Sequence, residues 1–348
     1  MAEWLQAGLG GLAACLLVVA LTPWAIRLAP CIGALDVPRD RRRMHTRVMP
    51  RTGGIALFVA FAVCTVLVDA PRAQLLALLW GATLLVVLGV LDDVYRLSAP
   101  LKLIVQLLVA TVVLGNGGGW PHLMLGAVDL TPGVWRLPVG VLWLLLLVNA
   151  HNMIDGLDGL AAGISALEAG ALAFVFALQG NVPMLTMSLI LAGCCVGYLP
   201  YNRHPAQVFM GDTGSQFLGL ALGVLSLHVD LYACGSLGVL VPLLIFALPL
   251  SDLIFAVVRR TLRGQSPFHA DRGHWHHRLI DVGMTQRQAC RWLYLLCAAL
   301  GTVSILICRE EWYGFAVYAT LGALALVVML EGAVGARVRP SKSEMNRK

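Results

Sequence analysis

The sequence predicts an all-α, polytopic membrane protein with about eleven transmembrane helices. Of its 348 residues, 59% are apolar and only 13% are charged. The mean hydropathy is +0.80, and a soluble domain would not need so much apolar surface. The apolar residues gather in runs, and the basic residues gather on alternate connections between those runs. These three observations exclude a water-soluble fold.

Eleven apolar runs are candidate spans, because about 20 apolar residues cross the hydrocarbon core of a bilayer. The fourth, fifth and eighth runs are short for this task. The ninth contains Pro242 and Pro249, and we expect it to bend there because proline interrupts helical hydrogen bonding. The runs cover residues 5–28, 53–69, 74–91, 101–115, 138–150, 159–178, 183–200, 214–229, 236–259, 290–308 and 313–332.

The basic residues predict the orientation. If the N-terminus lies outside, 22 of the 25 Lys and Arg residues fall in the cytoplasmic loops or the C-terminal tail, and only Arg72, Arg136 and Arg309 lie on the other side. Such asymmetry is typical of cytoplasmic loops. The first run follows Glu3 without any Lys or Arg, so we expect a retained helix and not a cleaved signal. Residues 1–335 then form one transmembrane domain, followed by a basic cytoplasmic tail, 336–348.

The cysteines and the net charge carry less information. The nine cysteines form no CxxC or zinc-ribbon spacing, so we predict no disulfide framework. Seven lie inside apolar runs and are expected to be small core residues: Cys15, Cys64, Cys194, Cys195, Cys234, Cys290 and Cys297. The formal net charge of +6 comes from basic residues in the predicted cytoplasmic loops and tail, so no nucleic-acid partner is predicted.

Five aspartates stand at predicted cytoplasmic ends of spans. Asp92 and Asp93 end the third run, Asp155 and Asp158 separate the fifth and sixth, and Asp212 precedes the eighth. Carboxylates beside apolar helices are costly unless they are paired or bind a cation. Each one alone could be a solvated loop residue or a helix cap. Five together on one side of a bundle indicate a functional site.

The segment from Asn149 to Gly159 is the most informative. Asn149, Asn152, Asp155 and Asp158 recur every three residues, so one helical face would present two amides and two carboxylates. Oxygen ligands without a thiolate favour Mg²⁺ or Mn²⁺ over Zn²⁺. Mg²⁺ usually completes its shell with phosphate and water, which predicts a diphosphate substrate.

A second motif, Phe209-Met-Gly-Asp-Thr-Gly-Ser215, opens the eighth run. The free N–H groups of a helix N-terminus can face an anion. Asp212 and Ser215 could instead be simple N-caps. The motif is short and gains weight only from the other segments.

The loop after the ninth run holds His269, Arg272, His274, His276 and His277. A zinc site or a chance surface cluster is possible. The favoured interpretation is a phosphate clamp, because Arg and His both supply hydrogen-bond donors to phosphate.

Two further features, the first loop and Asp252, have two readings each. The basic first loop, with His45 and Arg51, could anchor anionic lipid or guide an anionic headgroup to the site. Within the spans, Asp252 could pair structurally with the nearby arginines or have a functional role. Glu168 is expected to make a polar interhelical contact.

Several segments together resemble the polyprenyl-phosphate N-acetylhexosamine-1-phosphate transferases, in family order over about residues 33–290. The resemblance is strongest to the WecA-type branch, because the sister MraY branch lacks the Asp-Arg-x-His-x-His-His pattern. The segments are Asp36-x-Pro with His45 and Pro50-Arg51-x-Gly-Gly; Leu91-Asp92-Asp93 with Leu97 and Lys102; Asn149-x-x-Asn152-x-x-Asp155-Gly-x-Asp158-Gly-Leu160; Phe209-x-Gly211-Asp212-x-Gly-Ser215; and Ser266-Pro-Phe with Asp271-Arg272-x-His274-x-His276-His277.

The resemblance implies a role for each matching residue. Asn152 and Asp212 would hold Mg²⁺, or Mn²⁺, and Asp92 or Asp93 would act on the lipid phosphate. Asp155 and Asp158 would line the nucleotide pocket or the outer shell of the metal. The remaining residues would contact the substrates: Lys102, Arg272, His274, His276, His277 and His45. The stretch Val94-Tyr95-Arg96 departs from the branch, which is more acidic there.

The resemblance also implies the reaction and its place. N-acetylglucosamine-1-phosphate would pass from UDP-GlcNAc to undecaprenyl phosphate, with UMP released, as the first lipid-linked step of a cell-surface polysaccharide. The protein would lie in a bacterial inner membrane, with a periplasmic N-terminus, a cytoplasmic C-terminus and a cytoplasmic active site, as a monomer or homodimer. Another UDP-N-acetylhexosamine, a polytopic transporter and a zinc-dependent hydrolase remain alternatives.

Overall fold

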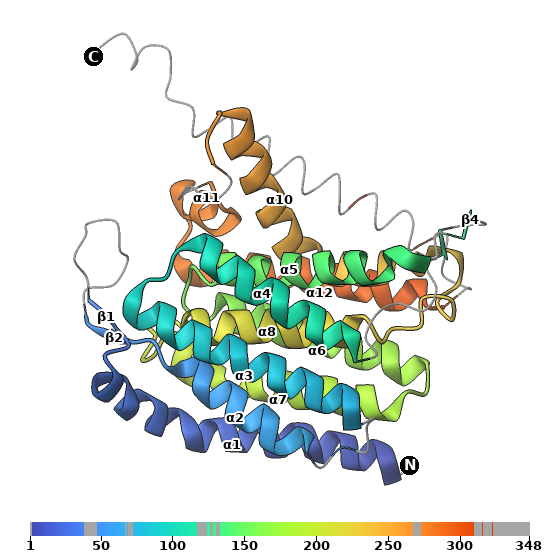
Figure 1. The fold of residues 1–348 in the computed structure, drawn as a ribbon, viewed down its shortest axis with the longest axis horizontal. Helices are drawn as coiled ribbons and strands as arrows, with labels where there is room; N and C mark the ends of the chain where they lie inside the picture. The colour runs from blue at the N-terminus through green and yellow to red at the C-terminus, as the bar shows by residue number, and fades with distance from the viewer. Residues whose placement is uncertain are drawn as a thin grey trace.

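The computed structural model is a bundle of roughly antiparallel helices (Figure 1). It describes residues 2–37, 47–66, 68, 72–116, 124–125, 128–129, 133–266, 273–309, 315 and 322. Its helices are α1 (Ala2–Ile32), α2 (Gly53–Thr65), α3 (Arg72–Tyr95), α4 (Ala99–Gly115), α5 (Arg136–Ile154), α6 (Leu160–Leu178), α7 (Val182–Asn202), α8 (Gly211–Ser226), α9 (Leu240–Ile245), α10 (Ala247–Leu262), α11 (Trp275–Asp281) and α12 (Gln286–Ile307), with 3₁₀ turns η1 (Gly133–Trp135) and η2 (Gly235–Leu237).

Two short hairpins accompany the helices. Strand β1 (Leu35–Asp36) pairs antiparallel with β2 (Met49–Pro50), and β3 (Met124–Leu125) pairs antiparallel with β4 (Val128–Asp129). The first hairpin lies at the end of the bundle that carries the aspartates, and the second lies at the other end (Figure 1). The all-α prediction therefore holds for the described residues, with strands only in these connections.

Helices occupy ten of the eleven predicted spans within the described residues. Six of them are long and apolar enough to cross a membrane, namely α1, α3, α5, α6, α7 and α12, while α2 and α4 are apolar but shorter. The eleventh run, 313–332, lies outside the described residues except for 315 and 322, and so does the tail 336–348. Several leucines of α1 are exposed on the outer face of the bundle, as expected of a lipid-facing helix.

The ninth span is broken into two helices at Phe246, between α9 and α10. Pro249 has no N–H to donate to the carbonyl of Ile245, so the helical ladder stops there. The expected bend is confirmed, and it is sharp enough for α10 to leave the bundle beside α11 (Figure 1).

Helix α8 forms the centre of the bundle, and all of its residues except Asp212 are buried. Its N-terminus lies against α3 because Gly89 has no side chain: a Cβ there would lie 2.4 Å from the backbone nitrogen of Thr213. This contact puts the end of α3, with Asp92 and Asp93, beside Asp212. Elsewhere in the core, Glu168 of α6 meets His151 of α5 at 2.8 Å, which confirms the expected interhelical contact.

One prediction about the cysteines is wrong. Cys234, in the α8–α9 connection, forms a disulfide with Cys308 at the C-terminal end of α12, while the other seven cysteines are free. The surrounding apolar runs suggested isolated core cysteines, but the pairing joins positions 74 residues apart. It lies at the opposite end of the bundle from Asp212.

Candidate active site

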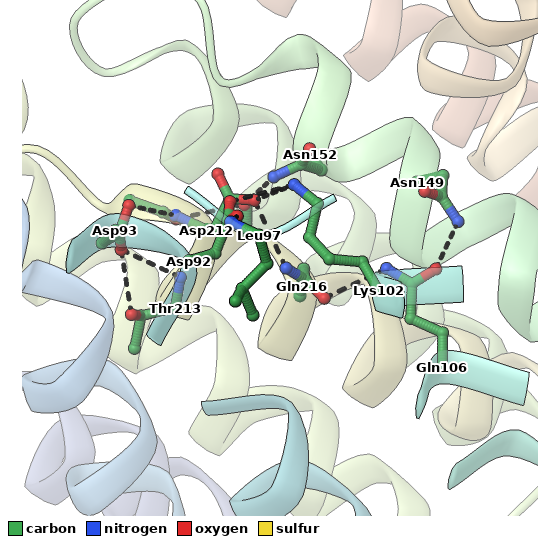
Figure 2. Close-up of polar contacts among 12 residues, drawn as sticks. Asp92, Asp93, Leu97, Lys102, Gln106, Asn149, Asn152, Asp212, Thr213 and Gln216 are labelled. Atoms are coloured by element: carbon green, nitrogen blue, oxygen red, sulfur yellow. Dashed lines mark hydrogen bonds and ion pairs between the residues drawn. The ribbon is translucent and has the colours of Figure 1, made fainter. Parts of the chain in front are cut away.

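Asp92 is held at the end of α3 by a tight turn. Arg96 adopts a left-handed conformation with φ of 55°, which is uncommon for a residue with a side chain. This turn lets the backbone N–H of Leu97 donate to Oδ1 of Asp92 at 2.7 Å. The ammonium of Lys102, from α4, lies 2.9 Å from Oδ2 of Asp92 and 3.0 Å from Oδ2 of Asp212. Lys102 thus bridges carboxylates from two helices (Figure 2).

Asp93 points the other way and caps α8. Its carboxylate accepts hydrogen bonds from the backbone N–H of Asp212 at 3.3 Å and from the hydroxyl of Thr213 at 3.1 Å. The side chain of Asp93 is fully buried, whereas that of Asp92 is 13% exposed. The free N–H groups of α8 therefore face a carboxylate of the chain itself. The N-cap position is Met210, which makes no side-chain cap bond, so Asp212 and Ser215 are not the caps.

Arg51 completes this charge cluster. Its Nε lies 3.0 Å from Oδ1 of Asp93, and its Nη2 lies 3.8 Å from Oδ1 of Asp212. The Pro50-Arg51-x-Gly-Gly motif contributed to the family resemblance, but no role in the site was predicted for Arg51 from the sequence. The glycines of this motif allow the start of α2 to pack directly on the start of α8, because a Cβ on Gly54 would lie 2.1 Å from the backbone nitrogen of Gly214.

Asn152 is positioned by Ser215. The Ser215 hydroxyl donates to the carbonyl of Gly211 at 3.1 Å and accepts from Nδ2 of Asn152 at 3.0 Å. Since a hydroxyl has one hydrogen to donate, the Asn152 amide nitrogen must face Ser215, and its carbonyl oxygen faces away. That oxygen is the group a hard cation would use.

A chain of buried amides continues inward from Asp212. Gln216 donates to Oδ2 of Asp212 at 3.4 Å, Gln106 donates to Gln216 at 3.1 Å, and Asn149 donates to Gln106 at 2.9 Å. Figure 2 shows this line of contacts running from the aspartates to Asn149. Sequence reasoning missed Gln106 and Gln216. The signal was a glutamine within an apolar run, where a buried amide needs a partner.

A cavity of about 580 Å³ opens beside the charge cluster and is lined by Arg51, Asp155, Asp158 and His277, among others. Burial, together with nearby carboxylates, raises the pKa of Asp155 to about 7, against the opposing effect of Arg51. The cavity therefore offers a polar ligand hydrogen-bond donors from Arg51 and His277 and acceptors from Asp155 and Asp158.

Asp158 is already engaged on the wall of the cavity. Its Oδ2 lies 2.8 Å from Nδ1 of His204 and accepts from the backbone N–H of Ala206 at 3.1 Å. It holds the 203–206 connection against the turn that follows α5.

The rings of His274, His276 and His277 pack together, with centroids 4.3–6.3 Å apart, but the three side chains have different partners. Nδ1 of His274 lies 2.9 Å from Oδ2 of Asp252, which also accepts the N–H of Trp275 at 2.9 Å, so Asp252 anchors the start of α11. His276 is buried against Gly156, and burial with the neighbouring His277 lowers its pKa to about 3. Of the three histidines that the structure describes in this loop, His277 alone lines the cavity, where it joins His204.

The structure thus brings together Asp92, Asp93, Lys102, Asn152 and Asp212, while Asp155, Asp158 and His277 line the neighbouring cavity. His45, His269 and Arg272 lie outside the described residues. In the part of the chain that the structure describes, no group of three His, Cys, Asp or Glu side chains could hold a metal by itself. The oxygen donors of Asp212 and Asn152 still fit Mg²⁺, which takes one or two carboxylates and completes its shell with substrate phosphate and water.

Comparison with known proteins identifies relatives along most of the chain. A family model described as glycosyl transferase family 4 matches residues 75–230, which include Asp92 and Asp212. The probable undecaprenyl-phosphate N-acetylglucosaminyl 1-phosphate transferase of Bacillus subtilis is 35% identical over 333 residues, covering 93% of this chain and 92% of that protein. The decaprenyl-phosphate N-acetylglucosaminephosphotransferase of Mycolicibacterium smegmatis is 33% identical, covering 83% of this chain and 79% of that protein. The undecaprenyl-phosphate alpha-N-acetylglucosaminyl 1-phosphate transferase of Escherichia coli K12 is 29% identical, covering 81% and 79%.

Proposed function

Because the chain belongs to the polyprenyl-phosphate N-acetylhexosamine-1-phosphate transferases of glycosyl transferase family 4, we propose that it transfers N-acetylglucosamine-1-phosphate from UDP-GlcNAc to undecaprenyl phosphate. The products are undecaprenyl-diphosphate-GlcNAc and UMP. The names of the relatives support a polyprenyl phosphate acceptor and a GlcNAc-1-phosphate group. The lipid product would begin a cell-surface polysaccharide at the cytoplasmic face of a bacterial inner membrane.

The observation that carries the proposal is the cluster of Asp92, Asp212, Lys102 and Arg51 beside a polar cavity. Joining a lipid phosphate to a nucleotide diphosphate brings like charges together. Cationic side chains next to carboxylates that can hold a divalent ion would offset this repulsion.

Asp212 and Asn152 would hold Mg²⁺, or Mn²⁺, whose bound charge would stabilise the diphosphate and the departing UMP. Asp92 would accept a proton from the lipid phosphate. This demand is small, because the second pKa of a phosphate monoester is about 6. Lys102 would bind phosphate oxygens, and Asp93, engaged in capping α8, would position Asp212.

A single displacement is the favoured route. Oδ1 of Asp92 accepts the N–H of Leu97, and Oδ2 contacts Lys102, so the carboxylate is oriented as a base. A two-step route through an aspartyl-phosphate would need this carboxylate to leave both partners and attack phosphorus.

The cavity would take the uridine and the diphosphate of the donor. Asp155 and His277 lie on its wall, while His274 and His276 hold α11 in place behind it. Arg51 lies where the cavity meets the aspartates and would face the transferred phosphoryl group.

The test uses purified protein with Mg²⁺, undecaprenyl phosphate and a panel of radiolabelled UDP-sugars. The expected result is a labelled lipid from UDP-GlcNAc with one UMP per product. Asp212→Asn should abolish turnover without loss of folded protein, while Asp230→Asn, exposed at the other end of the bundle, should keep it. Lipid product from Asp212→Asn at the wild-type rate would overturn the metal assignment, and no product with any UDP-sugar would overturn the function.

A further inference from the structure

Lys102 lies where a cation shared by two aspartates would lie. Its ammonium is 2.9 Å from Oδ2 of Asp92 and 3.0 Å from Oδ2 of Asp212. The lysine therefore places a positive charge between carboxylates at the ends of α3 and α8 (Figure 2).

We propose that the Lys102 ammonium stands in for the divalent ion in the metal-free protein, so that metal binding at Asp212 and the departure of Lys102 from Asp212 are one coupled event. This inference rests on the proposed function, which makes Asp212 a metal ligand. The further claim is that the Lys102 ammonium occupies the Asp212 carboxylate until the metal displaces it.

The geometry opposes joint occupancy. A Mg²⁺ ion about 2.1 Å from Oδ2 of Asp212 would lie only roughly 4 Å from an ammonium bound to the same oxygen, and like charges at that distance repel strongly. The other oxygen, Oδ1, already faces Nη2 of Arg51 at 3.8 Å. Each oxygen of Asp212 therefore already faces a cationic side chain, and a metal ion bound to either one would be repelled by it.

Lys102 is the cation able to move. Arg51 is tied through Nε to Asp93, whose side chain is fully buried. Lys102 has a flexible four-carbon stem and a compact charge, and its contacts are both with the exchangeable oxygens of Asp92 and Asp212. Once released, the ammonium can bind a substrate phosphate. The exchange therefore prepares the phosphate-binding group only when the metal is in place.

The test measures binding of Mn²⁺ alone to the purified full-length protein by electron paramagnetic resonance, without substrates. Lys102→Met should bind Mn²⁺ about 5- to 150-fold more tightly than wild type, the usual range for coupling between two ligands, although its transferase activity falls. Lys102→Arg, which keeps the charge, should not gain affinity. Arg27→Met is the matched control: it removes one positive charge at the same end of the bundle, where Arg27 stacks on Trp24, and should bind like wild type.

A second measurement uses the wild-type protein, so its result does not depend on whether a variant folds. Mg²⁺ should raise the rate at which an amine-specific reagent modifies Lys102, read by mass spectrometry. Equal or weaker Mn²⁺ binding by folded Lys102→Met overturns the proposal, as does undetectable binding by both proteins or an unchanged labelling rate. Neither assay contains substrate, so the two failures can be told apart. If Lys102→Met binds Mn²⁺ more tightly but the wild-type protein makes no lipid product from any UDP-sugar, the proposed function fails and the coupling between Lys102 and the metal stands.

Discussion

Asp93 of α3 holds the first turn of α8 through Thr213: its Oδ2 accepts the Thr213 hydroxyl at 3.1 Å and lies 3.5 Å from the Thr213 backbone nitrogen. The adjacent Asp92 makes no part of this cap and instead contacts Lys102. Two neighbouring aspartates therefore have different surroundings, which predicts different consequences when each is changed.

Asp93→Asn should lower the stability of the protein by about 1–3 kcal/mol, because both oxygens of Asp93 have partners and the amide nitrogen of Asn cannot accept: Oδ1 contacts Arg51 and the N–H of Asp212, and Oδ2 accepts the Thr213 hydroxyl. Asp92→Asn should melt close to wild type and lose turnover by about 100-fold or more, as expected when a proton acceptor is removed. Thermal unfolding in detergent, beside the radiolabelled transfer assay, measures both. A destabilised Asp92→Asn and an unchanged Asp93→Asn would reverse our assignment.

Gly156→Ala should reduce turnover by displacing α11, because a Cβ at Gly156 would lie 2.2 Å from Nε2 of His276. The expected loss is in kcat/KM for the nucleotide sugar, since His277 of the same helix lines the cavity. Gly170→Ala is the control: it has open space around it in α6 and should gain up to about 1 kcal/mol from helix propensity. Equal kinetics for the two variants would contradict the role given to α11.

Asp155 should make the metal-free protein less stable as the pH rises. Its folded pKa is raised from 3.8 to about 7, so its contribution is fully present below about pH 4 and is lost once the pH has passed about 7. At pH 8, Asp155→Asn should therefore have a higher free energy of unfolding than wild type, by at most about 4 kcal/mol at 1.36 kcal/mol per pKa unit. At pH 4 the two proteins should be equally stable. Melting curves across this range in a chelator are the measurement, with Asp230→Asn as control. A gain that is the same at every pH would argue against titration of Asp155.

The Cys234–Cys308 disulfide should face the periplasm, because disulfides persist in oxidising compartments and this end lies opposite Asp212. In intact cells, a membrane-impermeant reductant followed by an impermeant maleimide should label both cysteines. Replacing both by serine should cost up to about 4 kcal/mol for a loop of this length while turnover at low temperature is retained. Labelling only after permeabilisation would reverse the orientation.

Much of the fold could be predicted from the sequence, because the signals are local. A run of apolar residues specifies a buried or lipid-facing helix wherever it lies, and Pro249 interrupts the ninth run without help from any neighbour. The three-residue spacing predicted that Asn149, Asn152, Asp155 and Asp158 share one helical face. Only the two asparagines lie on the helix, because α5 ends at Ile154, and Asp155 and Asp158 belong to the turn that follows.

The sequence by itself thus determined an all-α membrane chain and the aspartates that meet at one end of it. Only the tertiary structure decided which of Asp92 and Asp93 faces the site, that Arg51 and the amide chain from Gln216 to Asn149 belong to it, and that Cys234 meets Cys308. Adjacent helical residues point about 100° apart, so their roles depend on which helix packs on which side. That choice comes from close contacts such as Gly89 on α8, which join segments more than 100 residues apart.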